Sequence, residues 1–171
     1  MNTIYLTGFM GAGKTTVGRE LGHRMSMPVW DTDDMIEQVS RKEVQEIFQE
    51  EGEARFREYE RDIIRNTSFN NAIITTGGGA VVNENNRRFM LQNGIVIFLY
   101  CDPKAIVKRL ANDTTRPLLD KDKEERINQL FIERFDDYIE ADYTVNTTMK
   151  SSQNVVSEIM GFLDRHEQIW A

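Results

Sequence analysis

Residues 8–15 read GFMGAGKT and match the pattern G-x-x-x-x-G-K-[ST] in full. A short apolar run precedes this segment at residues 4–7, and an amphipathic helix is expected after it at residues 14–25. Glycines let successive backbone N–H groups point into one concavity, and the helix N-terminus adds a positive dipole end. A tight turn with incidental glycines is the alternative. The strand before and the helix after favour a phosphate loop that binds ATP or GTP.

Within this loop, Lys14 is expected to reach the β- and γ-phosphates, and the Thr15 hydroxyl is expected to ligate Mg²⁺. The other loop residues expected to hold ATP are Gly11, Ala12, Gly13 and Thr16. A phosphate loop alone does not separate kinases from GTPases and motor ATPases. The chain is small and has no N-K-x-D guanine motif, which favours a small-molecule kinase that uses ATP.

Apolar strand patterns and helical patterns alternate along the rest of the chain. Strands are expected at 4–7, 29–30, 72–76, 95–100 and 143–145. Helices are expected at 14–25, 34–66 with a break at Gly52, 83–92, 103–110, 124–140 and 154–166. This alternation predicts an α/β domain with a parallel sheet. Residues 111–123 are polar, contain Pro117 and are expected to form a mobile surface loop.

Length and charge exclude several classes of protein. The 171 residues suit one domain, 1–171, because domains usually run about 100–200 residues. The formal net charge of −7 argues against a general nucleic-acid binder. No apolar run approaches the ~20 residues of a membrane helix, and residues 1–5 have no basic leader typical of a signal peptide. The single cysteine, Cys101, fits a cytoplasmic location.

Carboxylates and glycines follow two of the predicted strands. Asp31 and Asp33 come after the second strand, at the edge that faces the ligand crevice of an open α/β sheet. They could serve Mg²⁺ and a substrate hydroxyl, or residues 31–34 could simply cap the next helix. The glycines at 77–79 follow the third strand and either admit a ligand close to the backbone or form a flexible turn. The residues alone leave both alternatives open.

Three arginines are candidates for binding an anion. Arg57 and Arg134 lie in charged helical segments, where their spacing is typical of solvated i, i+4 ion pairs. Arg116 lies beside Pro117 in the predicted mobile loop, and a loop arginine that closes over phosphates neutralises the transferring charge.

Taken in order, these motifs resemble the shikimate kinase family. They are the phosphate loop, Asp31-Thr32-Asp33, Phe56-Arg57-x-x-Glu60, Gly77-Gly78-Gly79-Ala80-Val81, Arg116-Pro117-Leu118, and Arg134 followed by Tyr138. Each motif after the first is weak alone, but their order and spacing are specific together. The resemblance implies a P-loop, nucleoside-monophosphate-kinase-like fold with three layers: a five-stranded parallel sheet with helices on both faces.

The resemblance also implies the reaction. The family transfers the γ-phosphate of ATP, with Mg²⁺, to the 3-hydroxyl of shikimate and gives shikimate 3-phosphate and ADP in the pathway to chorismate and the aromatic amino acids. The implied partners are ATP and shikimate, without nucleic acid or membrane, and the chain is expected to be a monomer.

The family pattern assigns roles to residues of this chain. Asp33 binds the shikimate hydroxyls and helps to orient or deprotonate the attacking one. Arg57, Arg134 and the backbone N–H of Gly78 complete the shikimate pocket, with the arginines on the carboxylate. The resemblance further implies that Asp31, beside Thr15, holds Mg²⁺ through water. Arg116 covers ATP from a lid at about 111–123, and Lys150 contacts adenine. Lys14, Asp33 and Arg116 are the expected catalytic residues.

The chain departs from the family pattern after Arg134. The family usually has Pro-Leu-Tyr there, whereas this chain has Asp136 and Asp137 before Tyr138, and the segment to Ala141 is one residue shorter. Two other functions compete with the resemblance. A gluconate or nucleoside-monophosphate kinase would share the phosphate loop but lack the glycine run paired with two arginines, and a non-catalytic nucleotide-binding module would lack Asp33 or Arg116.

Overall fold

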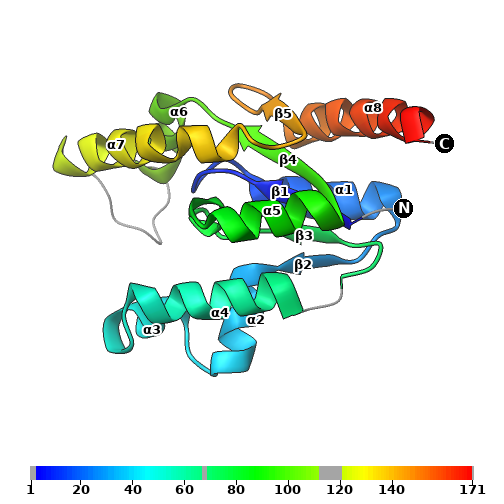
Figure 1. Cartoon of the computed structure of the whole chain (residues 1–171). Coiled ribbons are helices and arrows are strands. Elements are labelled where there is room, and N and C mark those ends of the chain that lie inside the picture. The colour runs from blue at the N-terminus through cyan, green and yellow to red at the C-terminus, as the bar shows by residue number, and fades with distance from the viewer. Residues whose placement is uncertain (1–2, 67–68, 112–120, 171) are drawn as a thin grey trace.

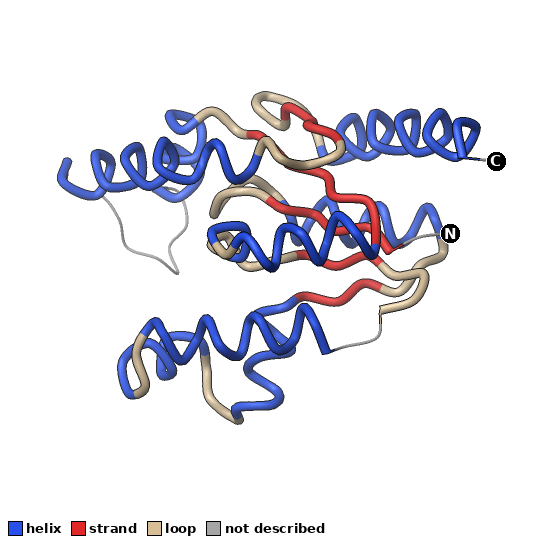
Figure 2. Tube along the Cα trace, viewed as in Figure 1, coloured by secondary structure: helices blue, strands red, loops and turns tan. Residues whose placement is uncertain are grey.

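The computed structural model describes residues 3–66, 69–111 and 121–170, with strands at the centre and helices around them (Figures 1 and 2). The strands are β1 (Thr3–Thr7), β2 (Val29–Asp31), β3 (Ile73–Thr75), β4 (Gly94–Tyr100) and β5 (Tyr143–Asn146). The helices are α1 (Lys14–Met25), α2 (Thr32–Ser40), α3 (Val44–Glu50), α4 (Glu53–Asn66), α5 (Glu84–Asn93), α6 (Pro103–Ala111), α7 (Lys121–Tyr138) and α8 (Ser152–Trp170), with a 3-10 turn, η1, at Ala80–Val82.

The five strands form one sheet in the order β2-β3-β1-β4-β5, and every neighbouring pair is parallel. All five residues of β1 are buried, as expected for a strand covered on both faces. Parallel strands place all their carboxyl ends at one edge of the sheet. The segments after β1, β2 and β3 therefore meet there, and these segments carry the phosphate loop, the aspartates and the glycine run.

Helices cover both faces of the sheet. Helices α1 and α8 pack against each other, with α1 on β3, while α4 and α5 pack together on the opposite face (Figure 1). Beside the main core, α2, α3 and α4 enclose a smaller one made of Ile36, Ile47, Phe56 and Ile63. This second core fixes the region that carries Asp33 and Arg57.

The predicted parallel sheet of five strands with helices on both faces is confirmed. The break at Gly52 is also confirmed, and its φ is 86°. The structure has a second break that the sequence does not predict. Helix α2 ends at Ser40 because Arg41 adopts a left-handed φ of 56°, a conformation that is uncommon for residues other than glycine. In the described parts of the chain, no helix is both long and apolar enough to span a membrane.

Candidate active site

The segment between β1 and α1 is an open turn that contains three glycines with positive φ, and Gly8 is the first of them at 152°. Gly11 and Gly13 have φ values of 76° and 98°, which glycine adopts without steric cost. Gly13 is the N-cap of α1, no side chain caps this helix, and its first turn has no acidic residue. The positive end of α1 is therefore available to an anion, as the motif predicts.

Lys14 lies across this turn. Its Nζ donates to the carbonyl oxygens of Gly8 at 2.6 Å and of Phe9 at 3.0 Å. The ammonium group is thus held beside the N-terminus of α1, where both positive features face the same cleft.

Asp31 has two hydrogen-bonding roles at the end of β2. Oδ1 accepts from the backbone N–H groups of Asp33 at 2.9 Å and Asp34 at 3.4 Å, and so caps α2. Oδ2 accepts from the Thr75 hydroxyl at 2.5 Å. The helix-cap interpretation is therefore correct, yet Asp31 also lines the cleft that contains Lys14. Capping and metal binding do not exclude each other here.

Asp33 and Glu60 approach the same glycine from two different helices. A Cβ atom on Gly77 would lie 2.8 Å from Asp33 Oδ1 and 2.9 Å from Glu60 Oε1, so a larger residue would displace both carboxylates. Within the described chain, neither of these buried oxygens has a hydrogen-bond partner. Buried polar atoms are rarely left unpaired, so both oxygens are suited to accept from a bound hydroxyl or water.

The surroundings of these two acids bring their titration close to neutral pH. Burial raises the pKa of Asp33 to about 6, and the Asp31 carboxylate adds to the rise against the opposing charges of Lys14 and Arg57. Burial likewise raises the pKa of Glu60 to about 7, against the charge and hydrogen bond of Arg57. Acids that titrate near neutral pH are typical of sites that move protons.

Arg57 faces the glycine run from α4. It pairs with Glu60 at 2.8 Å and with Glu53 at 3.2 Å, so the ion pairs expected from helical spacing are present. A Cβ atom on Gly79 would collide with the Arg57 guanidinium. The glycine is therefore needed for this arginine to reach the site, and the ion pairs hold its orientation.

Arg134 reaches the same region from α7. It is partly buried, and its guanidinium carbon lies 5.9 Å from the centre of the Phe9 ring. Arg57 and Arg134 both lower the pKa of Glu60. Two guanidinium groups from different helices therefore act electrostatically on one buried acid, and guanidinium groups are suited to binding a carboxylate.

Gly78 lies between the phosphate loop and the arginines. Its Cα faces the loop, because a Cβ atom there would be 3.4 Å from the Met10 nitrogen. Its carbonyl accepts from the Tyr138 hydroxyl, and Tyr138 stacks on Phe98 with ring centres 4.8 Å apart. Among the residues that the structure describes, no hydrogen bond comes from the Gly78 N–H. This N–H is the donor that sequence analysis expects in the pocket.

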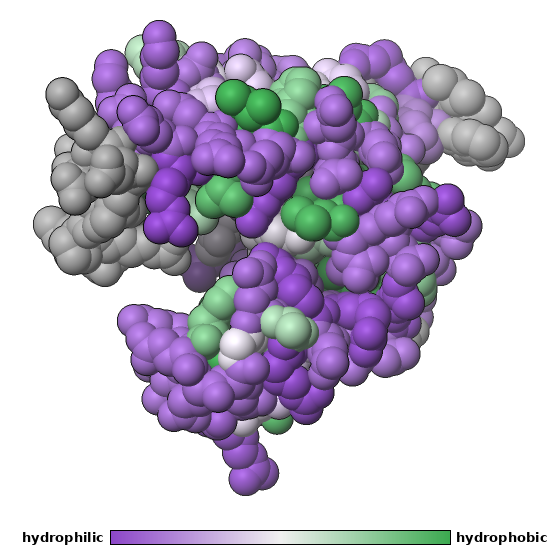
Figure 3. Space-filling model, turned by 60° about the vertical axis from the view of Figure 1, so that its left-hand side comes forward, coloured by the Kyte–Doolittle hydropathy of each residue, from purple (hydrophilic) through white to green (hydrophobic). Residues whose placement is uncertain are grey.

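Lys14, Asp31, Asp33 and Gly78 line one open cleft of about 340 Å³, whereas Arg57, Glu60 and Arg134 are not among its lining residues. Figure 3 shows a hollow in the surface between the lower lobe, formed by α2–α4, and the body above it. The lining residues are Met10, Gly11, Gly13, Lys14, Thr15, Thr16, Asp31, Asp33, Thr76, Gly77 and Gly78. The structure therefore brings together the predicted phosphate-binding residues, both aspartates and the glycine run.

Ala12 and Lys150 are not among the residues that line this cleft. Ala12 is buried under the loop, and its carbonyl accepts from the Thr147 hydroxyl at 3.2 Å. Lys150 lies between β5 and α8 and pairs with Glu158 at 2.7 Å, outside the cleft lining. Arg116 and the central part of the predicted lid, residues 112–120, lie outside the described residues. The roles of Lys150 and Arg116 stay predictions.

Two residues beside the site, Glu60 and Arg109, have no role predicted from the sequence. Glu60 was part of a motif, and its burial beside Asp33 could not be read from helical spacing. Arg109 on α6 donates to the carbonyl oxygens of Gly11 at 3.0 Å and Thr147 at 3.2 Å. It ties the phosphate loop to the segment after β5, and no motif marks it.

Comparisons with known proteins identify the relatives of this chain. A family model described as shikimate kinase matches residues 10–164. A shikimate kinase from Bacillus cereus (strain AH187) is 47% identical over 159 residues, which are 93% of this chain and 96% of that protein. A shikimate kinase from Persephonella marina is 40% identical over 162 residues, which are 94% of this chain and 98% of that protein.

Solved structures give the same result. The shikimate kinase from Acinetobacter baumannii in complex with shikimate has a TM-score of 0.90 at 35% identity, with 97% of this chain and 94% of that chain covered. A gluconokinase from Sinorhizobium meliloti has a TM-score of 0.64 at 15% identity, with 99% and 95% covered. At that identity the second likeness concerns the fold alone.

Proposed function

The chain belongs to the shikimate kinase family, and we propose how its residues divide the work of phosphoryl transfer. The enzyme transfers the γ-phosphate of ATP to the 3-hydroxyl of shikimate and releases ADP. The observation that carries the residue assignment is the meeting of Asp33 and Arg57 at the glycine run, next to the phosphate loop. Acceptor hydroxyl and phosphoryl donor are thereby brought to one place.

Arg57 and Arg134 bind the shikimate carboxylate. The charges of both guanidinium groups oppose the rise in the pKa of Glu60 that burial causes. A guanidinium group can donate two parallel N–H bonds to a carboxylate. The Gly78 N–H adds a donor on the side of the phosphate loop. Together these donors fix the orientation of the acceptor ring, so that one of its hydroxyl groups faces the γ-phosphate.

Asp33 orients the attacking hydroxyl and accepts its proton. The pKa of about 6 leaves the carboxylate mostly ionised at neutral pH, yet basic enough to take the proton as transfer proceeds. The hydroxyl oxygen forms a bond to the γ-phosphorus, the bond from that phosphorus to the bridging oxygen breaks, and ADP leaves with the electron pair. Transfer of this kind needs mainly positioning and charge stabilisation.

Lys14 and the N-terminus of α1 hold the phosphates. The Thr15 hydroxyl and the Asp31 carboxylate line the same cleft and are hard oxygen donors, so they fit Mg²⁺. Both oxygens of Asp31 already accept hydrogen bonds, which favours contact through water. In the described chain, no cluster of three or more His, Cys, Asp or Glu side chains could hold a metal. Bound Mg²⁺ neutralises charge on the phosphates.

The remaining assignments belong to the same proposal. Arg116 covers the transferring phosphate from the segment at about 111–123, and Lys150 contacts adenine. The enzyme acts as a monomer in the cytoplasm. These four statements rest on the family resemblance and on composition.

The test measures ADP release with ATP and Mg²⁺, with shikimate, gluconate or AMP as acceptor. Release is expected with shikimate alone. Lys14→Ala should lower kcat by about 10²–10³-fold, because the phosphates lose a charged donor. Lys104→Ala, an exposed lysine on α6, is the matched control and should leave kcat unchanged. Release with gluconate or AMP but not shikimate would overturn the acceptor assignment.

A further inference from the structure

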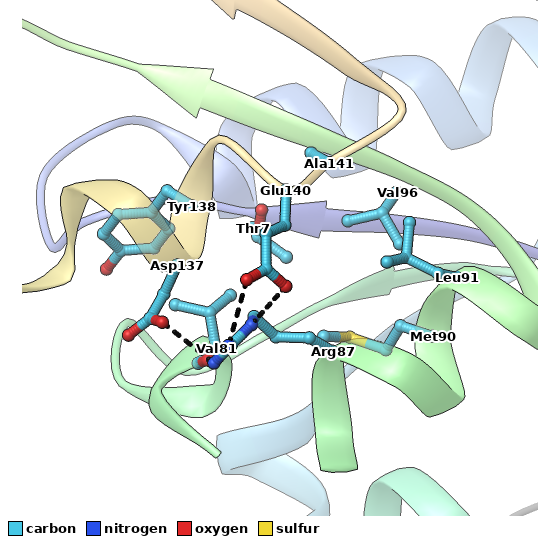
Figure 4. Close-up of a pocket in the computed structure, with 10 residues that line it drawn as sticks. All are labelled: Thr7, Val81, Arg87, Met90, Leu91, Val96, Asp137, Tyr138, Glu140 and Ala141. Atoms are coloured by element: carbon cyan, nitrogen blue, oxygen red, sulfur yellow. Dashed lines mark hydrogen bonds and ion pairs between the residues drawn. The ribbon is translucent and has the colours of Figure 1, made fainter. Parts of the chain in front are cut away.

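Arg87 links η1, which follows the glycine run, to the C-terminal end of α7. It projects from α5, and its side chain is 12% exposed. Figure 4 shows its guanidinium below Val81, with interactions to Asp137 and Glu140. Val81 belongs to η1, Asp137 lies in the last turn of α7, and Glu140 lies two residues beyond the end of that helix.

All three nitrogens of the Arg87 guanidinium make polar contacts. Nε and Nη2 donate to the two oxygens of Glu140 at 2.6 and 3.1 Å. Nη1 donates to the Val81 carbonyl at 2.7 Å and pairs with Asp137 at 2.9 Å. A planar fork with fixed donors suits this arrangement, whereas a lysine could not reproduce it.

The partners of Arg87 are directly connected to the glycine run. In η1, the Ala80 N–H donates to Gly77 and the Val82 N–H donates to Gly79, each at 3.1 Å. On α7, Tyr138 stands next to Asp137 in sequence, and its hydroxyl donates to Gly78. A movement of η1 relative to α7 would therefore change the carboxylate-binding end of the cleft.

Arg134 lies one helical turn before Tyr138 on α7, and its charge opposes the rise in the pKa of Tyr138, to about 12, that burial causes. The position of Arg134 relative to the glycine run therefore depends on how the end of α7 packs against η1. We propose that Arg87 is a positioning residue for the acceptor: it clamps the end of α7 to η1 and so sets where Arg134 meets the acceptor carboxylate. This inference rests on the proposed function.

Asp137 makes this clamp a property of the present chain. The family pattern usually has leucine at this position, and the aspartate was a departure without an explanation in the sequence. In the structure it supplies one of the two carboxylates that hold Arg87. The departure therefore adds charge to the contact between α5 and α7 and does not disturb Tyr138, which stays buried.

The test compares Arg87→Ala, Arg87→Lys and Arg88→Ala. Arg88 is the control on the same helix, since it is exposed and pairs only with Glu84 among the described residues. Arg87→Ala should raise KM for shikimate about tenfold and leave KM for ATP within about twofold, with Arg87→Lys in between, since carboxylate pairs of this kind contribute several-fold to binding. Arg88→Ala should match the wild type.

A second readout separates positioning from simple stabilisation. The methyl ester of shikimate has no carboxylate charge, so Arg134 cannot form an ion pair with it. With this ester, Arg87→Ala should therefore change kcat/KM by less than about twofold. Equal losses for acid and ester would overturn the positioning role. If Arg87→Ala does not fold, the double variant Asp137→Asn/Glu140→Gln must give the same contrast. A wild type without activity on shikimate would overturn the proposed function as well.

Discussion

Asp33, the proton acceptor of the proposed mechanism, is a partly buried acid whose ionisation lowers the stability of the fold. Its pKa of about 6 lies above the ordinary value of 3.8 because burial and Asp31 both oppose ionisation. The raised pKa means that the folded chain holds the proton more tightly than the unfolded one. The stability that the protonated form contributes is therefore present in acid and is lost as the pH rises through about 6.

Activity is expected to follow the ionisation of Asp33. The kcat/KM for shikimate should rise between about pH 5 and 7 and level off above, with a midpoint near 6, because only the ionised carboxylate accepts a proton. Asp33→Asn should remove this limb along with most of the activity, whereas Glu60→Gln should keep it. A flat profile from pH 5 to 8 in the wild type would contradict the assignment.

The same substitution should stabilise the fold. At pH 8, Asp33→Asn removes a buried charge, and the free energy of unfolding should rise by up to about 3 kcal/mol, at about 1.4 kcal/mol per pKa unit. Denaturant unfolding of the two proteins measures the difference, which should vanish near pH 4. This opposite effect on activity and stability is typical of catalytic groups.

Sequence motifs predicted some site residues and could not decide others. Lys14 and Asp33 were predicted because the chemistry depends on local order: a loop before a helix, and an acid after a strand. The sequence does not decide whether Arg57 binds a ligand, because an ion pair such as that with Glu60 forms in a solvated helix as readily as at a binding site. Only the tertiary approach of Gly79 to its guanidinium shows which side it faces.

At the scale of elements, α1 lies very close to the sheet because of glycine. A Cβ atom on Gly18 would lie 2.6 Å from Thr75 Cγ2, and Thr75 is the residue whose hydroxyl donates to Asp31. The packing of this helix and the hydrogen bonding of the site are therefore coupled through one threonine.

A pair of glycine-to-alanine substitutions tests this packing. Both gain up to about 1 kcal/mol of helix propensity. Gly18→Ala should nevertheless lower the free energy of unfolding by about 1–2 kcal/mol, because overpacking costs about 1–3 kcal/mol. Gly161→Ala on α8 should raise it, since its Cβ meets only Arg165 Nη1 at 3.6 Å among the described residues. Denaturant unfolding with equal m-values provides the measurement, and stabilisation by both substitutions would contradict the close contact.

Element boundaries were predictable where a residue type enforces them. Gly52 ends a helix in the sequence and in the structure, because its positive φ favours glycine. The break at Arg41 and the turn η1 were missed, because the contacts that stabilise them are tertiary. The wrong extent of the helix from 34 to 66 follows from this, since a polar helical pattern continues through the turn at 41–43.

At the scale of the whole molecule, the strand order places the proposed sites of the two ligands side by side at one edge of the sheet. The central strand β1 leads into the phosphate loop, while β2 and β3 on one side lead to Asp33 and the glycine run. Arg134 comes from α7, beyond β4 in sequence. In the proposed mechanism each ligand therefore contacts its own set of elements, and the two sets meet at Gly78.

This division predicts that ligand-linked stability separates by site. Shikimate at 100 times its Kd should stabilise the fold by about 2.7 kcal/mol, or about 5–10 °C in Tm for a chain of this size. Arg134→Ala should lose this shift at the same concentration and keep the shift caused by ATP, because α7 contacts the acceptor. Lys14→Ala should show the reverse. Thermal unfolding with each ligand alone measures both shifts. If Arg134→Ala abolished the shift with ATP as well, the two ligands would share one binding surface, and the separation by strand order would be wrong.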